Sequence, residues 1–163
     1  RDLRYTILDE FKSPIRQCYE SLYKVIGKIG AAKVLHLICS DFFPVWDNPI
    51  ANAILEEDIK FGMQGQVAKI PAYRQRDYQK FMKQMQDPAK MQKFIKKVQR
   101  ERKGEFRKSP SAEYYSFMQA TQNFIKRYES VLSDLATKYD KGILKISDEC
   151  FWWATHRSLS LFF

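Results

Sequence analysis

Two glycines and two lysines early in the chain have the spacing of a phosphate-binding hairpin. The segment from Gly27 to Ile54 reads GKIGAAKVLHLICSDFFPVWDNPIANAI, and Gly27 and Gly30 bracket a short turn between two helical patterns. Such a turn leaves backbone N–H groups free at the N-terminus of the second helix, where they can bind a phosphate oxygen. Lys28 and Lys33 would add positive charge close to that site.

This layout resembles the helix-hairpin-helix DNA glycosylase superfamily over about residues 25–55. In that superfamily a glycine hairpin holds the DNA backbone, and an aspartate caps the helix that begins shortly afterwards. The stretch FPVWDNPIANAI is similar to the segment around this aspartate, which corresponds to Asp47. The chain is also similar to an uncharacterised prokaryotic family with the signature A-K-x-L-H…F-P-x-W-D-N, and that similarity implies no activity.

The first resemblance implies the chemistry of base removal from DNA. Asp47 would stabilise positive charge on the sugar or deprotonate the nucleophile, and Lys33, or else Lys28, would attack C1′ to form a Schiff base. The target base would leave the duplex stack and enter an aromatic pocket. His36 lies three residues after Lys33 and could orient a carboxylate or the substrate. The substrate-binding residues implied in this way are Gly27, Gly30, His36 and Trp46.

The same residues also have purely structural interpretations. Asp47 has the position of an N-cap for the helix that follows it. Lys33 is interpreted equally well as a solvated lysine on a helix surface. His36 lies in an apolar run, where a hydrogen-bonded core histidine is common. At the level of the sequence both sets of interpretations stay open.

Positive charge is concentrated in the middle of the chain. The 163 residues have a formal net charge of +9, and residues 61–110 carry fourteen Lys and Arg against four Asp and Glu. A local positive surface attracts polyanions even where the rest of a protein is neutral. We expect nucleic acid, in particular double-stranded DNA, as the partner, with an anionic membrane surface or an acidic protein as alternatives. The expected contact residues are Lys90, Lys93, Lys96, Lys97, Arg100, Arg102 and Lys103.

Apolar periodicity predicts an all-α fold with a helix-hairpin-helix-like element. In the basic segment, Met91, Phe94, Ile95 and Val98 recur at helical spacing, and no strand pattern or internal repeat is present. Serine and aspartate before the helical patterns predict N-caps at Ser13, Asp47, Asp87, Ser111 and Ser147. Helices are expected at residues 3–11, 14–26, 31–39, 49–59, 112–139 and from 147 onward, with two more in the basic segment.

We expect one helical domain over residues 1–163. Its parts are a hairpin-bearing segment (1–60), the basic helices (69–108), and a long helix followed by an aromatic C-terminal helix (111–163). Three scattered cysteines and two histidines do not supply a zinc site or a disulfide framework, so we expect no metal or cofactor and a cytoplasmic location. No apolar stretch is long enough to span a bilayer.

Three functions are compatible with these observations. The first is a DNA glycosylase or abasic-site lyase that uses the hairpin segment. The second is a non-catalytic nucleic-acid-binding module that uses the basic helices as its contact surface. The third is a helical interaction domain that binds an acidic protein or an anionic surface.

Overall fold

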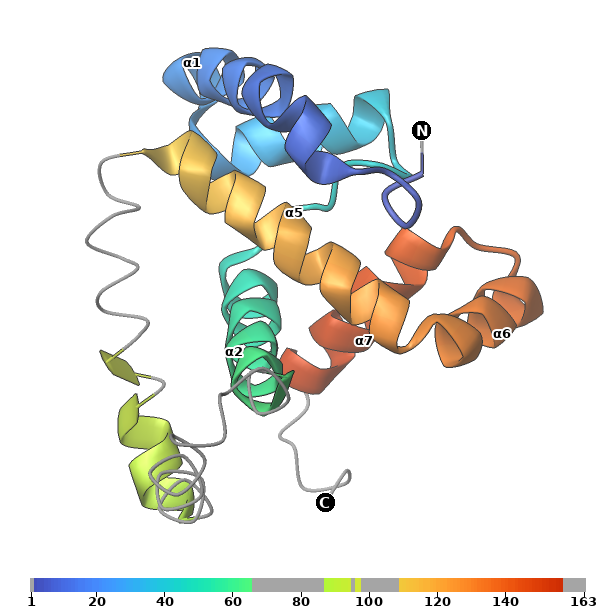
Figure 1. The fold of residues 1–163 in the computed structure, drawn as a ribbon. Coiled ribbons are helices and arrows are strands. Elements are labelled where there is room, and N and C mark those ends of the chain that lie inside the picture. The colour runs from blue at the N-terminus through green and yellow to red at the C-terminus, as the bar shows by residue number, and fades with distance from the viewer. Residues whose placement is uncertain (1, 66–86, 95, 98–108, 157–163) are drawn as a thin grey trace. The chain divides into compact units, whose positions relative to one another are not determined.

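In a computed structural model of the protein, every regular element among the described residues is a helix, which confirms the predicted all-α fold (Figure 1). The described residues are 2–65, 87–94, 96–97 and 109–156. The chain divides into two compact units. The first unit comprises Arg1–Leu55 and Ser109–Phe163, and the second comprises Glu56–Lys108. Among the described helices, none has both the length and the apolar composition that crossing a bilayer requires.

The first unit is a helical assembly built around α5. Its elements are η1 (Leu8–Phe11), α1 (Lys12–Ile38), the beginning of α2 (Asn48–Gly65), α5 (Pro110–Arg127), α6 (Glu129–Tyr139) and α7 (Ile143–His156). Helix α5 contacts α1, α6 and α7, so it forms the centre of this unit. The largest fully buried side chains include Tyr19 on α1 and Tyr114 and Phe117 on α5. Their rings make the α1–α5 contact aromatic, with Tyr19 and Tyr114 stacked 4.3 Å apart.

Helix α1 folds back on itself (Figure 1), and its helical backbone is broken at Gly27. Gly27 has φ 72° and ψ −178°, a backbone conformation that is essentially restricted to glycine. The hydroxyl of Tyr19 donates a hydrogen bond to the carbonyl of Lys28 at 3.2 Å, whereas nine residues of straight helix would span roughly 13 Å. We call residues 12–26 the first arm of α1 and residues 28–38 its second arm.

The predicted break between two helices is thus confirmed at Gly27, but the turn is shorter than expected. Gly30 has helical backbone and lies inside the second arm. A Cβ atom on Gly30 would be 3.1 Å from the Cβ of Ile26, so Gly30 lets the Ile26 side chain lie close to the second arm. The hairpin therefore depends on one special backbone conformation, at Gly27, and on one close contact, at Gly30.

Three of the predicted N-caps are wrong, at Ser13, Ser111 and Ser147. Ser13 caps nothing because η1 continues directly into α1, which begins at Lys12. Ser111 is already helical, and the cap of α5 is Ser109, whose Oγ accepts a hydrogen bond from the N–H of Ala112 at 3.3 Å. The expected helix over residues 3–11 is reduced to the short helix η1.

The C-terminal helices also differ from the prediction. The long helix expected over residues 112–139 is interrupted at Tyr128, which separates α5 from α6. Helix α7 begins at Ile143, four residues before Ser147, so Ser147 is a buried residue inside a helix and not its N-cap. The Ser147 hydroxyl donates to the carbonyls of Ile143 and Leu144.

Gln122 interrupts the apolar stripe of α5 and anchors the N-terminal segment. Its side chain is buried, and Nε2 donates hydrogen bonds to the carbonyls of Leu3 and Thr6. The N–H of Leu3 in turn donates to the carbonyl of Asp41 at 2.9 Å. Burying a side-chain amide without hydrogen-bond partners would cost free energy, and these two hydrogen bonds avoid that cost. Gln122 therefore holds the N-terminal segment on α5.

The Gly27→Ala variant tests the dependence of the hairpin on glycine. No atom lies within 4 Å of a Cβ placed on Gly27, so the cost comes from the backbone conformation alone. We expect the free energy of unfolding to fall by about 1–3 kcal/mol, measured by urea denaturation. The matched control, Val25→Ala on the exposed end of the first arm, should change it by less than about 0.5 kcal/mol. Equal effects of the two variants would contradict the account of the turn.

Candidate functional site

The described part of the second unit contains a short basic helix. Residues 88–94 and 96–97 are helical. Asp87 is its N-cap, as predicted, because Oδ1 accepts a hydrogen bond from the N–H of Ala89 at 2.9 Å. At about 100° per residue, the four lysines of this helix fall within an arc of about 120°. They are Lys90, Lys93, Lys96 and Lys97, and all four are exposed. We call this surface the basic face.

The basic face lies opposite the apolar side of the same helix. Met91 and Phe94 are partly buried, in agreement with the predicted amphipathic pattern. Lys90 is 3.9 Å from Asp87, a long ion pair between two well-exposed side chains, and such pairs contribute little. Three further residues predicted to contact nucleic acid, Arg100, Arg102 and Lys103, lie outside the described residues.

The charge of the chain divides along the boundary between the two units. The second unit carries fifteen Lys and Arg against seven Asp and Glu, a net charge of +8. The first unit carries thirteen against twelve, a net charge of +1. The separation of charge that the sequence indicates therefore coincides with a structural division.

Lys28, one of the predicted catalytic residues, is held by two contacts in the first unit. Its Nζ lies 2.7 Å from Oε2 of Glu113, in the first turn of α5. The same Nζ lies 3.9 Å from the centre of the Trp46 ring, in cation–π geometry. Lys28 thus joins the second arm of α1 to α5 and to the segment before α2. The structure brings Lys28 and Trp46 together, as a packing contact.

Trp46 is buried and fully engaged. Only 2% of its surface is exposed, and its ring packs at a steep angle against Phe117, 4.9 Å between centres. The indole Nε1–H donates to Oδ1 of Asn48 at 2.8 Å. To stack on a flipped base, Trp46 would have to leave this core position.

Oδ1 of Asp47 makes no hydrogen bond to Lys33 in the described structure. Lys33 is exposed on the second arm of α1. Oδ1 of Asp47 is buried and has no hydrogen-bond partner within the described part of the chain. The Asp47 carbonyl accepts the first hydrogen bond of α2, from the N–H of Ala51 at 2.8 Å. Asp47 therefore has the backbone position of an N-cap, while Oδ1 of its side chain makes no capping hydrogen bond.

His36 and Tyr114 hold the loop between α1 and α2. Nδ1 of His36 lies 2.7 Å from the carbonyl oxygen of Phe43, and since a carbonyl only accepts, Nδ1 carries the proton. The hydroxyl of buried Tyr114 donates to the carbonyl of Pro44 at 2.9 Å. His36 is therefore a hydrogen-bonded structural residue in this arrangement. The loop it fixes ends at Trp46 and Asp47.

Asp148 on α7 is a buried carboxyl group that the sequence analysis does not single out. It is 8% exposed, it has a hydrogen bond from the backbone of Val45, and its Oδ1 has no partner among the described residues. Burial raises its pKa from 3.8 to about 7. Since α7 begins at Ile143, Asp148 follows buried Leu144 by one helical turn, on the apolar face. A helix predicted to begin at Ile143 would have placed Asp148 on the apolar face.

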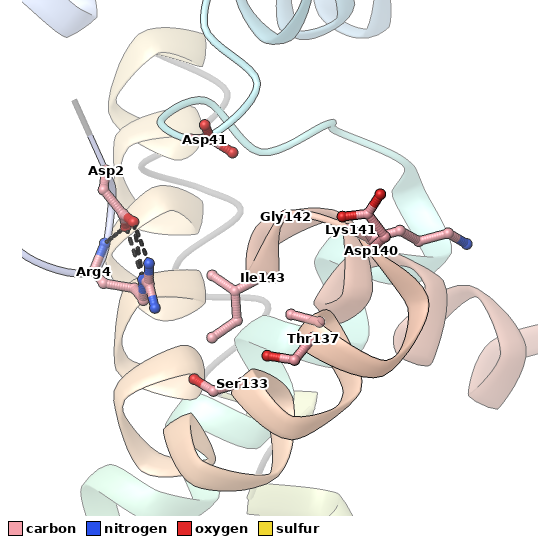
Figure 2. A pocket seen from close by; sticks show the side chains of 10 residues that line it. Asp2, Arg4, Asp41, Ser133, Thr137, Asp140, Lys141, Gly142 and Ile143 are labelled. Carbon is pink, nitrogen blue, oxygen red and sulfur yellow. Dashed lines mark hydrogen bonds and ion pairs between the residues drawn. The ribbon is translucent and has the colours of Figure 1, made fainter.

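An open cavity of about 490 Å³ lies beside the start of α7 (Figure 2). Its charged groups are largely engaged within the protein. The Arg4 guanidinium binds both carboxylate oxygens of Asp2, as Figure 2 shows, and Lys141 pairs with Glu149 at 2.8 Å. No cluster of three potential metal ligands exists among the described residues.

Comparisons with protein-family models, with curated proteins and with solved structures find no match to this chain.

The buried Asp148 predicts a specific dependence of stability on pH. Because its folded-state pKa is raised, the folded protein keeps a proton that the unfolded chain releases between about pH 4 and pH 7, and stability falls as the pH rises through this range. Between about pH 5 and about pH 8, we expect the free energy of unfolding to fall by about 2–3 kcal/mol more in the wild type than in the Asp148→Asn variant. Urea denaturation at the two pH values measures this difference.

Asp134→Asn is the control for this experiment. Asp134 is exposed on α6, and its replacement should leave the pH dependence of the wild type in place. The same loss of stability in wild type and in Asp148→Asn would mean that Asp148 is ionised in the folded protein.

Proposed function

We propose that the protein binds nucleic acid, in particular duplex DNA, through the basic face of the second unit. The observation that supports this proposal is the placement of four exposed lysines within one arc of a capped, amphipathic helix. Four ammonium groups on one side of a helix repel one another unless they are near negative charge. A polyanion relieves this repulsion.

The chemistry of the basic face favours contact with phosphates over reading of bases. The ammonium group of lysine is a compact charge on a flexible stem, and it pairs well with phosphate oxygens. It does not form the bidentate hydrogen bonds that recognise base edges. Binding of this kind is driven by release of counterions from the DNA and depends steeply on salt. The proposal is therefore a backbone-binding module with little sequence preference.

The first unit supports a scaffolding role in this proposal better than a catalytic one. Lys28 is engaged with Glu113 and Trp46, and Trp46 is buried. None of Cys18, Cys39 and Cys150 forms a disulfide in the described structure, in keeping with the cytoplasmic location that forms part of the proposal.

Replacement of the four lysines by glutamine tests the proposal. Replacing all four lysines, Lys90, Lys93, Lys96 and Lys97, should reduce the slope of log affinity against log salt by roughly 3.6. The reduction is roughly 0.9 for each phosphate that a lysine neutralises. Fluorescence anisotropy with a labelled duplex over a salt series measures this slope.

The control removes the same charge from the first unit. It replaces four exposed lysines by glutamine: Lys12, Lys24, Lys126 and Lys138. This control should leave the slope close to the wild-type value. Equal changes in both quadruple variants would contradict a localised contact surface, and no binding by the wild type would contradict the proposal altogether.

An abasic-site lyase is the second candidate, and the buried, unpartnered Oδ1 of Asp47 favours it. In a lyase, the Lys33 amine would attack the C1′ aldehyde of an abasic site, lose water and form an imine that borohydride reduces to a stable amine. For a binding module we expect no borohydride-trapped adduct with an abasic duplex. An adduct that persists in Lys24→Ala but disappears in Lys33→Ala and Asp47→Asn would establish the second candidate instead.

A further inference from the structure

The second arm of α1 exposes large apolar side chains along its length. Ile29 is 43% and Leu37 is 83% exposed, and both lie on the outer side of this arm together with Lys33. At the turn, Val25 is 81% and Ile26 is 45% exposed. Ile26 lies against Gly30, so the turn and the second arm form one continuous surface. We call Val25, Ile26, Ile29 and Leu37 the apolar outer face.

The opposite side of the same arm is already buried. Ala31, Ala32 and Leu35 belong to the core of the first unit, each no more than 3% exposed. A helix that is apolar on both sides normally has both sides covered. Clustered exposed apolar side chains mark interaction surfaces more often than scattered ones do. Among the described residues nothing covers the apolar outer face.

The charge around this face identifies the kind of partner that would cover it. Residues 21–40 contain three lysines and no Asp or Glu. Lys24 and Lys33 are exposed, whereas Lys28 is paired with Glu113. A second copy of the chain would bring like charges together, and the second unit, with a net charge of +8, would do the same. The partner must therefore be both apolar and negatively charged.

We propose that the apolar outer face docks on an anionic membrane surface. Interfacial helices insert aliphatic side chains at the boundary between headgroups and acyl chains and carry lysines that reach the headgroups. Here Lys33 lies one turn from both Ile29 and Leu37 on the same side of the arm. The lysine stems add apolar contact, and their ammonium groups reach the anionic headgroups. The face has aliphatic side chains and lysines but no exposed Trp, Tyr or Arg, the residue types that dominate protein–protein hot spots. This surface belongs to the first unit and does not depend on the basic face.

The test uses the full chain and vesicles of equal parts phosphatidylcholine and phosphatidylglycerol. The basic face is also attracted to such vesicles, so the test variant changes only the apolar outer face: Ile29→Gln with Leu37→Gln. We expect its vesicle affinity, measured by co-sedimentation, to fall by about tenfold or more, because two aliphatic side chains no longer insert. Neutral glutamine keeps the net charge and the helical propensity of the arm.

The control is the pair Ile7→Gln with Val131→Gln, two comparably exposed aliphatic residues elsewhere in the first unit. This pair should bind vesicles like the wild type, and both pairs should bind duplex DNA equally. Far-ultraviolet circular dichroism checks that the variants are folded, and a second test variant, Val25→Ser, should weaken vesicle binding in the same direction.

Three results would overturn the proposal. The first is equal vesicle binding by the test and control pairs, which would mean that the vesicles are bound only through electrostatic attraction to the basic face. The second is an absence of vesicle binding by the wild type. The third is concentration-dependent dimerisation that Ile29→Gln with Leu37→Gln abolishes, seen by sedimentation velocity, which would make a second copy the occupant.

Discussion

The backbone of Gly27 is the constraint on which the first unit depends. At φ 72° and ψ −178° the chain reverses in one residue, and the two arms of α1 come close enough for Tyr19 to bond the carbonyl of Lys28. The reversal places Lys28 where it reaches both Glu113 on α5 and Trp46 in the segment before α2. A straight helix would separate Lys28 from Tyr19 and remove this junction between α1, α5 and the loop.

The loop between α1 and α2 receives a second set of constraints from buried polar groups. His36 and Tyr114 bond its carbonyls, and the Val45 backbone bonds the carboxyl of Asp148. These bonds make the loop part of the core, and one of them is made by His36, which the sequence analysis also selects as a substrate-binding candidate. His36 and Trp46 have satisfied partners that explain their positions without any substrate.

The fold class and several helix boundaries could be predicted from the sequence because they depend on local chemistry. Asp87 caps the basic helix through hydrogen bonds to nearby backbone, and Gly27 breaks α1 through its own backbone freedom. Gln122 and Asp148 could not be interpreted in the same way. Their roles depend on Leu3, Thr6 and Val45, which are distant in sequence, and no local pattern indicates those partners.

The candidate site was predictable as a region of charge but not as an arrangement of catalytic groups. Residue counts alone show the excess of Lys and Arg in residues 61–110, and this excess lies almost entirely in the second unit. A catalytic centre requires three-dimensional convergence of side chains. Lys33 is exposed, Lys28 is paired with Glu113, and Oδ1 of Asp47 has no hydrogen-bond partner among the described residues.

The most direct test of the proposed function is lysine footprinting by reductive methylation, with and without duplex DNA, read out by mass spectrometry. We predict that DNA protects Lys90, Lys93, Lys96 and Lys97. Exposed lysines of the first unit, such as Lys12 and Lys126, should stay as reactive as in the free protein. Protection centred on Lys33 with the basic face unprotected would contradict the account and assign DNA contact to the hairpin of α1.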